Sequence, residues 1–332
     1  MSQGTGIDRR KVLGLGVGLA GASVLPVPAF ASTEMDMLVA YYGALTNTAP
    51  VAVGMEKGFY ETSNVKVGEV VSTIGGGTAI RNMIGGGLDY GIVGTSAAVT
   101  AIREGIEVKI VHGVIRTMED LFWVSRPDSG INSIQDLEGK KIGFTKPKSI
   151  SETMVLWMLK KHDMIGKAEP VSLGGLGAGL AALDSGGVDA ALILEPIWSK
   201  LKHKYQVAFT LKEFPPMMQM VGVATQKMID EQPDVLRDLV TGWSKSADFT
   251  YSDPDAAAML MSKRFGENTL SPDVAVSAVN NMAKINYWSR GEIDVEGLEL
   301  FLDTMRQQGE WEGEANWASM IDESFLPEGM RH

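Results

Sequence analysis

The sequence of 332 residues contains no cysteine. Disulfide bonds, thiolate metal sites, cysteine nucleophiles and lipid attachment through an N-terminal cysteine are therefore excluded together. Histidine is also scarce, because the chain has only His112, His162, His203 and His332, and no two lie at metal-ligand spacing on one helix face. Since His112 lies within an apolar stretch, we expect a buried structural residue there, and we expect no metal site.

Positive charge is in short supply. The chain has 30 Lys and Arg residues against 41 Asp and Glu residues, a net charge of −11. An acidic protein is poorly suited to binding nucleic acid or anionic membrane surfaces. The apolar stretch Val12 to Leu25 has about fourteen residues, which is too short to span a bilayer comfortably. We therefore expect no nucleic-acid partner and no stable membrane insertion.

The N-terminal segment is typical of an export signal. Arg9-Arg10-Lys11 precedes the apolar stretch, and Ala29-Phe30-Ala31 offers a small-x-small cleavage site. We expect residues 1–31 to be removed near Ala31, which would leave a soluble periplasmic protein. Asp8 to Leu13 resembles a twin-arginine (Tat) signal, although Asp8, Val12 and Gly14 depart from the usual pattern. An ordinary Sec signal is the alternative and leads to the same compartment.

Two glycine-rich stretches lie a hundred residues apart, at 75–96 and 175–196. Each contains a glycine loop, a helical segment, a Gly-Gly turn, an apolar strand and a polar loop. A repeated unit of this kind predicts two similar α/β lobes. Chance coincidence among 38 glycines is the alternative explanation. The matching positions are Gly75, Gly77, Gly86, Gly87 and Asp89 in the first stretch and Gly175, Gly177, Gly186, Gly187 and Asp189 in the second.

Strand-like and helix-like segments alternate up to Thr225, and a helical tail follows from Lys227. This order predicts parallel sheets flanked by helices. Turn residues at 124–130 and 215–221 mark two positions where the chain could cross between the lobes. We therefore expect a discontinuous first lobe, residues 32–125 and 219–332, and a second lobe at 126–218. Ser149 to Glu152 has the pattern of a helix capping box.

Nucleotide binding and hydrolytic chemistry find no support in the motifs. Neither glycine stretch completes G-x-G-x-x-G, because the final glycine is missing in both. No phosphate-binding loop ends in Gly-Lys-Ser or Gly-Lys-Thr, and no Gly-x-Ser-x-Gly nucleophile elbow is present. We therefore expect no cofactor and no enzymatic activity.

Ligands of open parallel sheets bind beyond the carboxyl ends of the strands, where helix N-termini attract anions. Loops from both lobes would face each other there and form one crevice. Glu195, held by Pro196, would receive an amine or form a salt bridge with a residue of the neighbouring lobe. Arg116 and Lys148 would meet an anion or remain solvated, and Tyr42 and Trp198 would form apolar walls or belong to the core. The candidate ligand-binding residues are Tyr42, Asn47, Thr48, Gly76, Thr95, Ser96, Arg116, Lys148, Ser149, Glu195 and Trp198.

Four segments, in this order, resemble periplasmic solute-binding proteins of the sulfonate, nitrate and taurine type. They are residues 49–60, 86–91, 133–142 and 183–196, and the resemblance covers about 36–250. It implies a bilobal type II periplasmic-binding fold, with two α/β lobes joined by two crossovers. The implied function is capture of a small anionic or zwitterionic solute for an ABC importer, with the permease and its ATPase as partners of a monomeric receptor.

The thiamine-pyrimidine synthase family is similar in fold but relies on a cysteine-rich motif that this chain lacks. An enzyme acting on a pyrimidine-type molecule and a periplasmic sensory receptor remain the alternative functions. Two loops that would select the ligand, 42–47 and 146–151, match no subfamily. The identity of the solute is therefore open.

Overall fold

The computed structural model describes residues 32–73, 76–147 and 149–331. The expected export signal at 1–31, with its cleavage site near Ala31, and the candidate Lys148 lie outside the described residues. The strands of the described part are β1 (Thr33–Ala40), β2 (Val65–Thr73), β3 (Tyr90–Gly94), β4 (Val108–Ile115), β5 (Phe122–Ser125), β6 (Lys141–Phe144), β7 (Glu169–Ser172), β8 (Ala191–Ile193), β9 (Gln206–Thr210) and β10 (Met220–Thr225).

The first sheet has the order β2-β1-β3-β10-β4. β1 runs parallel to β2 and β3, whereas β10 runs antiparallel to both β3 and β4. The expectation of a purely parallel sheet is therefore wrong, and the sheet is mixed. Every residue of β10 is buried, so its sequence reads as a continuous apolar run that carries no information about strand direction.

A second group of strands consists of the sheet β8-β5-β9 and the parallel pair β6-β7. Gly143 donates its backbone N–H to the Ala190 carbonyl at 2.8 Å, which joins β6 to the segment that leads into β8. β5 is antiparallel to β8 and β9. Residues 122–125, expected in the first lobe, pair in the structure with strands of this second group.

The chain therefore passes between the two groups of strands twice. It leaves β4 and enters β5 through residues 116–121, and it returns from β9 to β10 through residues 211–219. We call these segments the first and second crossover. They lie side by side, because Met217 N–H donates to the Arg116 carbonyl at 3.2 Å and Gln219 N–H donates to the Ile115 carbonyl at 2.8 Å.

The two glycine-rich stretches occupy equivalent positions in the two groups. The first contains α2 (Gly76–Gly85) between β2 and β3, and the second contains α5 (Leu176–Asp184) between β7 and β8. Each helix ends in a turn with a left-handed glycine, Gly87 at φ 70° and Gly186 at φ 78°. Each stretch therefore has a helix between two strands, as predicted, although the left-handed glycine lies one position earlier in the second stretch.

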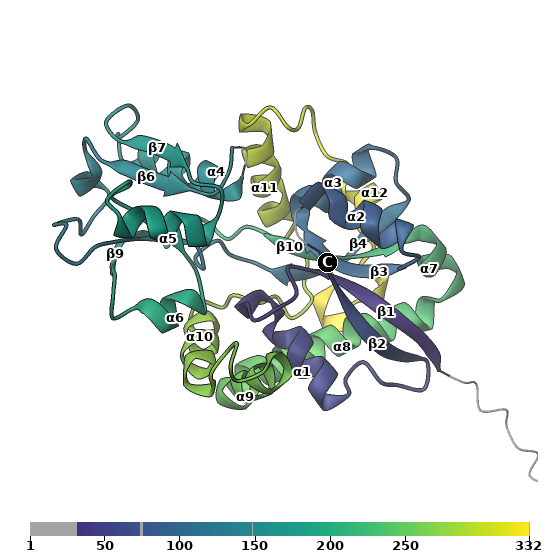
Figure 1. Cartoon of the computed structure of the whole chain (residues 1–332). Coiled ribbons are helices and arrows are strands. Elements are labelled where there is room, and N and C mark those ends of the chain that lie inside the picture. Colours follow the sequence, from purple (N-terminus) through teal and green to yellow (C-terminus); the bar gives the residue numbers. More distant parts are fainter. Residues whose placement is uncertain (1–31, 74–75, 148, 332) are drawn as a thin grey trace, which may run out of the picture. The chain divides into compact units, whose positions relative to one another are not determined.

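Helices cover both faces of the first sheet and form the C-terminal tail. In Figure 1, α2 and α3 lie on one side of this sheet and α1 and α8 lie on the other. No helix of the described part combines the length and apolar composition needed to cross a membrane. The remaining helices are α1 (Ala49–Lys57), α3 (Thr95–Arg103), α4 (Ile150–Lys161), α6 (Ile197–Leu201), α7 (Gln226–Glu231), α8 (Pro233–Ser252), α9 (Pro254–Phe265), α10 (Pro272–Lys284), α11 (Val295–Gln307) and α12 (Trp317–Met320).

Local sequence signals determine where several helices begin and end. Ser149 accepts a hydrogen bond from the Glu152 N–H and caps α4, which confirms the capping motif. Asp253 caps α9 in the same way, with Pro254 in the first helical position. Gly58 ends α1 with a left-handed φ of 69°, a conformation that glycine adopts at low cost. These boundaries follow from the sequence.

His112 is fully buried in β4, as predicted. Its Nδ1 donates to the Gly113 carbonyl at 2.9 Å, and its Nε2 accepts from the Tyr90 hydroxyl at 2.7 Å. Burial lowers the pKa of His112 to about 4, so the ring is neutral. Gly222 of β10 lies directly opposite, and a Cβ atom there would be 1.9 Å from His112 Nε2. The glycine makes room for the imidazole.

Replacement of Gly222 by alanine is expected to lower the free energy of unfolding by about 3 kcal/mol, because the added methyl group collides with a buried ring. Urea denaturation measures the change. Gly85→Ala is the matched control, since no atom lies within 4 Å of a Cβ at Gly85 and the change should stay within about 1 kcal/mol. Equal stabilities of the Gly222→Ala variant and the unchanged protein would contradict the packing argument.

Candidate functional site

A cavity of about 440 Å³ lies between the two groups of strands. Its lining comes from residues just beyond the carboxyl ends of strands, from first turns of helices and from both crossovers. This position is where open α/β sheets bind ligands. The lining residues used below are Ala40, Tyr41, Asn47, Ser96, Asp120, Leu121, Thr145, Ser149, Ser151, Leu194, Glu195, Gln219, Met220, Tyr287 and Phe301.

Four of the predicted ligand-binding residues line this cavity. They are Asn47, Ser96, Ser149 and Glu195, from four separate segments of the chain. Asn47 also contacts Met220 Sδ through its amide nitrogen at 3.8 Å. The expectation that loops far apart in the sequence form one crevice is therefore met by these residues.

The hydroxyl groups of two predicted ligand-binding residues are hydrogen-bonded to backbone carbonyl groups. Thr48 Oγ1 lies 2.7 Å from the Gly43 carbonyl and 2.8 Å from the Leu45 carbonyl, so it closes its own loop. Thr95 Oγ1 donates to the Met218 carbonyl at 2.6 Å and ties α3 to the second crossover. Both side chains are buried, and neither residue is among those that line the cavity.

Three other predicted residues have partners elsewhere. Arg116 forms an ion pair with Glu292 at 3.0 Å, Tyr42 packs edge-on against Phe265 and receives a hydrogen bond from Arg264, and Trp198 packs edge-on against Phe122. Gly76 is the first residue of α2. Arg116, Tyr42 and Trp198 are not among the residues that line the cavity, and the aromatic side chains that do line it are Tyr41, Tyr287 and Phe301.

Hydroxyl groups cluster at the start of α4. Ser151 Oγ is 2.8 Å from Thr145 Oγ1 and 2.9 Å from Ser149 Oγ, and it also accepts the Thr145 N–H at 3.0 Å. We call these three residues the hydroxyl cluster. Ser149 caps the helix, so the cluster lies where free N–H groups and the helix dipole favour negative charge. This end of the cavity suits anionic oxygen atoms.

Glu195 is buried at the end of β8 and joins two segments. Its Oε1 accepts from Asn281 Nδ2 at 2.7 Å and from Ser199 Oγ at 3.0 Å, and its Oε2 accepts the Ser199 N–H at 3.0 Å. Asn281 belongs to α10, so the carboxylate connects the second group of strands to the helical tail. The expected salt bridge of Glu195 is not among the ion pairs of the described residues, because its partners Ser199 and Asn281 are neutral.

Asp120 is one of several cavity residues that the sequence did not predict, together with Gln219 and Tyr287. It lies in the first crossover and is 6% exposed. Its Oδ1 accepts from Gln219 Nε2 at 3.2 Å and its Oδ2 accepts from the Tyr287 hydroxyl at 3.1 Å. Burial raises the pKa of Asp120 to about 7, although both hydrogen bonds act in the opposite direction. The signal in the sequence was an acidic residue just beyond the carboxyl end of β4.

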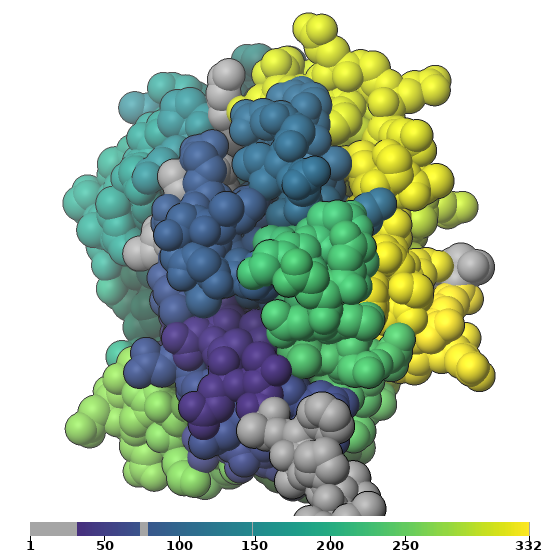
Figure 2. All heavy atoms as spheres, turned by 90° about the vertical axis from the view of Figure 1, so that its right-hand side faces the viewer, coloured from purple at the N-terminus to yellow at the C-terminus, as the bar shows by residue number. Residues whose placement is uncertain are grey.

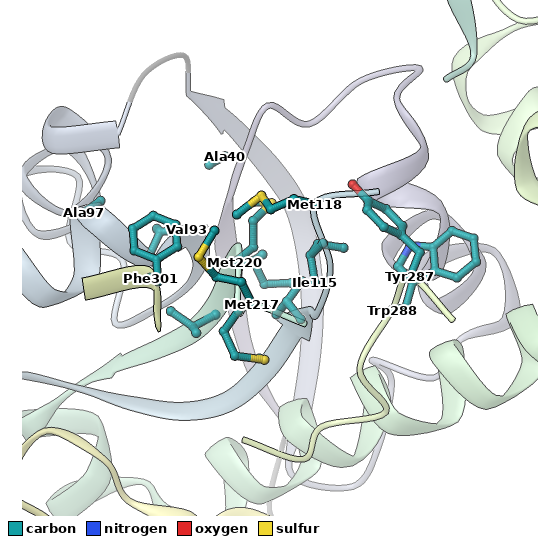
Figure 3. Packing of buried hydrophobic residues seen from close by; sticks show 14 of the residues in the cluster. Ala40, Val93, Ala97, Ile115, Met118, Met217, Met220, Tyr287, Trp288 and Phe301 are labelled. Atoms are coloured by element: carbon teal, nitrogen blue, oxygen red, sulfur yellow. The ribbon is translucent and has the colours of Figure 1, made fainter. Parts of the chain in front are cut away.

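Apolar side chains complete the walls. Met220 and Phe301 line the cavity, and Figure 3 shows Met118 and Met217 in the buried cluster beside Met220, with the Tyr287 hydroxyl turned away from Trp288 toward the side where Met118 lies. Tyr41 follows β1 with a left-handed φ of 59° and remains 44% exposed. A strained residue at the mouth of a cavity is typical of a binding site. The cavity is thus partly apolar, with polar groups at defined points.

The charge of the lining is one-sided. Asp120 and Glu195 are both buried, whereas no lysine, arginine or histidine is among the described residues that line the cavity. Among the described residues there is also no group of three or more acidic, histidine or cysteine side chains that could hold a metal ion. The described lining therefore favours a positively charged group near one of these carboxylates.

A second cavity, of about 660 Å³, lies at the opposite end of the first sheet. It is lined by the beginning of β1, by the turn before β3 and by Met228 of α7. In Figure 2 the beginning of β1 lies between the blue segment around β3 and the green helices α7 and α8. This cavity is at the amino end of β1, away from the loops that bind ligands in open sheets. We therefore take the smaller cavity as the candidate site.

Residues 45–257, more than half of the chain, match the NMT1/THI5-like family. The chain belongs to this family. No curated protein matches the sequence. Family membership agrees with the resemblance noted in the sequence, which covers much of the same range.

Solved structures establish the fold. The periplasmic aliphatic sulphonate binding protein SsuA from Escherichia coli matches with a TM-score of 0.70 and 16% identity, over 87% of this chain and 92% of that one. A ligand-binding component of an ABC-type import system from Staphylococcus aureus matches at 0.69 and 15%, over 90% and 99%. The desulfurization enzyme DszB matches at 0.65 and 14%, over 88% and 98%. The fold is that of the periplasmic binding proteins.

The buried Asp120 predicts a specific pH dependence of stability. The pKa of Asp120 is about 7 in the folded state and about 4 in the unfolded state. Its contribution to the free energy of unfolding is therefore present below pH 4 and is lost as the pH rises through 7. Relative to the Asp120→Asn variant, the unchanged protein should lose up to about 4 kcal/mol between pH 4 and pH 8. Chemical denaturation at both pH values measures the difference.

The exposed Asp128 in the turn after β5 is the matched control. Asp128→Asn removes the same charge from a solvated position, so its stability should follow that of the unchanged protein at both pH values. A constant stability difference between Asp120→Asn and the unchanged protein from pH 4 to pH 8 would refute the assignment.

Proposed function

We propose that this protein is the periplasmic solute-binding component of an ABC importer, and that it captures a small anionic or zwitterionic organic solute of the sulfonate or taurine type. The observation that carries the proposal is the polar and apolar cavity beyond the strand ends, lined from both groups of strands. The family match and the sulphonate-binding and ABC-import structures with the same fold support it.

In this proposal the two groups of strands are the cores of two lobes. The first comprises residues 32–115 and 220–331, the second comprises 122–210, and the two crossovers join them. Rotation about the crossovers would open and close the cavity, as in other hinged binding proteins. Two contacts between the lobes would form on closure, the Glu195–Asn281 hydrogen bond at 2.7 Å and the Ser199–Ser277 hydroxyl contact at 2.9 Å.

The location and partners follow from the same proposal. The twin-arginine-like signal at 1–31 would direct export to the periplasm, and the mature monomer would deliver its solute to a membrane permease driven by an ATPase. The net charge of −11 makes nucleic acid an unfavourable partner. No cofactor is required for capture and release of a solute.

An enzyme is the second candidate because DszB has the same fold. The absence of cysteine deprives this chain of a thiol nucleophile. The cavity offers Asp120 as an acid or base, but its hydrogen-bond partners are Gln219 and Tyr287, and among the described residues no serine or threonine donates a hydrogen bond to it. The arrangement favours binding without turnover.

A thermal-shift panel of sulfonates, taurine, nitrate, carboxylates and aminopyrimidines tests the proposal. A true ligand at 100 times its dissociation constant should stabilise the protein by about 2.7 kcal/mol. Mass spectrometry of the recovered ligand should find it unchanged. A chemically altered ligand would support the enzyme instead, and a panel without any stabilising compound would contradict the proposed function.

The hydroxyl cluster provides a test of where the solute binds. Thr145→Val keeps the shape of the side chain but removes its hydroxyl, so affinity for the panel's ligand should fall about tenfold if that hydroxyl donates to an anionic oxygen. The control is Ser319→Ala, an exposed position in α12 that lies outside the cavity lining. Unchanged affinity in Thr145→Val would place the anionic group elsewhere.

A further inference from the structure

Asp120 and Gln219 belong to different crossovers and meet in the wall of the candidate site. The hydrogen bond of 3.2 Å between them joins the two segments about which the lobes would rotate. Tyr287, from the loop before α11, adds the second hydrogen bond at 3.1 Å. A ligand group that binds Asp120 therefore lies in the cavity and also next to the Asp120–Gln219 hydrogen bond that joins the two crossovers.

Building on the proposed function, we propose that the solute carries a positively charged nitrogen and that Asp120 is the residue that binds it. The solute class is then an amino-substituted organic acid, with its ammonium group at Asp120 and its acidic group at the hydroxyl cluster. Asp120 becomes a specificity-determining residue placed at the junction of the crossovers.

Hydrogen-bond capacity favours Asp120 over Glu195 for this role. Each oxygen of Asp120 accepts one hydrogen bond from another residue, at 3.1 or 3.2 Å, and a carboxylate oxygen can accept two. Glu195 accepts three hydrogen bonds, one of them at 2.7 Å from Asn281. Asp120 therefore has more room for a new donor.

The surroundings of Asp120 leave its charge without a partner of opposite sign among the described residues. Tyr287 faces it and is neutral, since burial and the Asp120 charge keep the pKa of that phenol well above its usual range. Glu119 is next in the chain, Arg116 of the same crossover is paired with Glu292, and Glu195 lines the same cavity. A buried carboxylate without a cation is costly, and an ammonium group would remove that cost.

The hydroxyl cluster indicates which chemical group the other end of the solute carries. Thr145, Ser149 and Ser151 lie at the N-terminus of α4, where hydroxyl and N–H donors suit a sulfonate, carboxylate or phosphonate. An acidic wall and a donor-rich wall in one cavity match a zwitterion better than a simple anion. The apolar residues Leu194, Met220 and Phe301 would surround the carbon chain.

Binding of an ammonium group should be linked to loss of a proton. Burial raises the pKa of Asp120 to about 7, so below that pH the solute must displace a proton to form the ion pair. The dissociation constant should therefore increase about 30-fold when the pH falls from 8 to 5.5. A simple anion that accepted a hydrogen bond from protonated Asp120 would show the opposite dependence.

Isothermal titration with matched pairs of probes tests the inference on the mature chain. Each pair shares an acid group and differs by one amine: 2-aminoethanesulfonate and ethanesulfonate, 3-aminopropanesulfonate and propanesulfonate, 2-aminoethylphosphonate and ethylphosphonate. Any ligand found in the thermal-shift panel is added to the set. We expect an amine-bearing compound to bind at least tenfold more tightly than its partner at pH 8.

Two variants test whether binding depends on the carboxylate of Asp120 itself or only on a negative charge in this part of the chain. Asp120→Asn should weaken binding of the amine-bearing compound at least tenfold at pH 8 and should abolish the pH dependence. Glu119→Gln removes a charge from the adjacent position, which is not among the residues that line the cavity. It should leave the affinity for the amine-bearing compound and its pH dependence unchanged. Circular dichroism confirms that each variant is folded.

Three results overturn the inference while the proposed function stands: equal affinity for amine-free partners, tighter binding at pH 5.5, or a panel ligand without a cationic nitrogen. Unchanged affinity and pH dependence in Asp120→Asn overturn it as well. If no compound binds at all, the proposed function fails and the inference fails with it.

Discussion

The side-by-side packing of the two crossovers is the constraint on which the rest of the structure depends. Backbone hydrogen bonds from Met217 to Arg116 in the first crossover and from Gln219 to Ile115 at the end of β4 bring residues about a hundred positions apart into register. This register places β10 between β3 and β4, and it brings the carboxyl ends of the two groups of strands to one cavity. Because backbone groups form the junction, its geometry does not depend on any one side chain. The side chains that project from it, Asp120 and Gln219, are therefore available for recognition.

The division of polar groups within the cavity gives the site its chemical character. Hydroxyl groups gather at the start of α4, where the helix favours negative charge, and carboxylates occupy the crossover and the end of β8. Methionine and aromatic side chains fill the space between, and thioethers can adapt to solutes of different shape. Glu195 has a structural part in this arrangement, since it connects α6 and α10 through Ser199 and Asn281. A single cavity thus combines charge recognition with contacts that would hold the lobes together.

Much of the fold could be predicted because local signals are strong. The repeat of glycine stretches, the capping motif at Ser149 and the buried His112 all follow from residue spacing and apolar runs. Strand direction could not be predicted, since a buried strand such as β10 looks the same in either orientation. The site was predicted in part. Asn47, Ser96, Ser149 and Glu195 line the cavity, but a sequence does not show that a hydroxyl such as Thr95 is already bound to a distant carbonyl. Asp120 was missed because its burial depends on Gln219 and Tyr287, which are far along the chain.

The position of β10 has a consequence for the order in which the protein can be made. β4 is hydrogen-bonded to β10 and is not a neighbour of β3 in the sheet, so the first sheet has a gap in its interior until residue 225 has been synthesised. The strands of the second group, which lie within residues 122–210, are complete before that strand emerges. Long-range pairing of this kind forms late and slowly. During synthesis the second group of strands could therefore fold first. The first sheet could be completed only after β10 has been made.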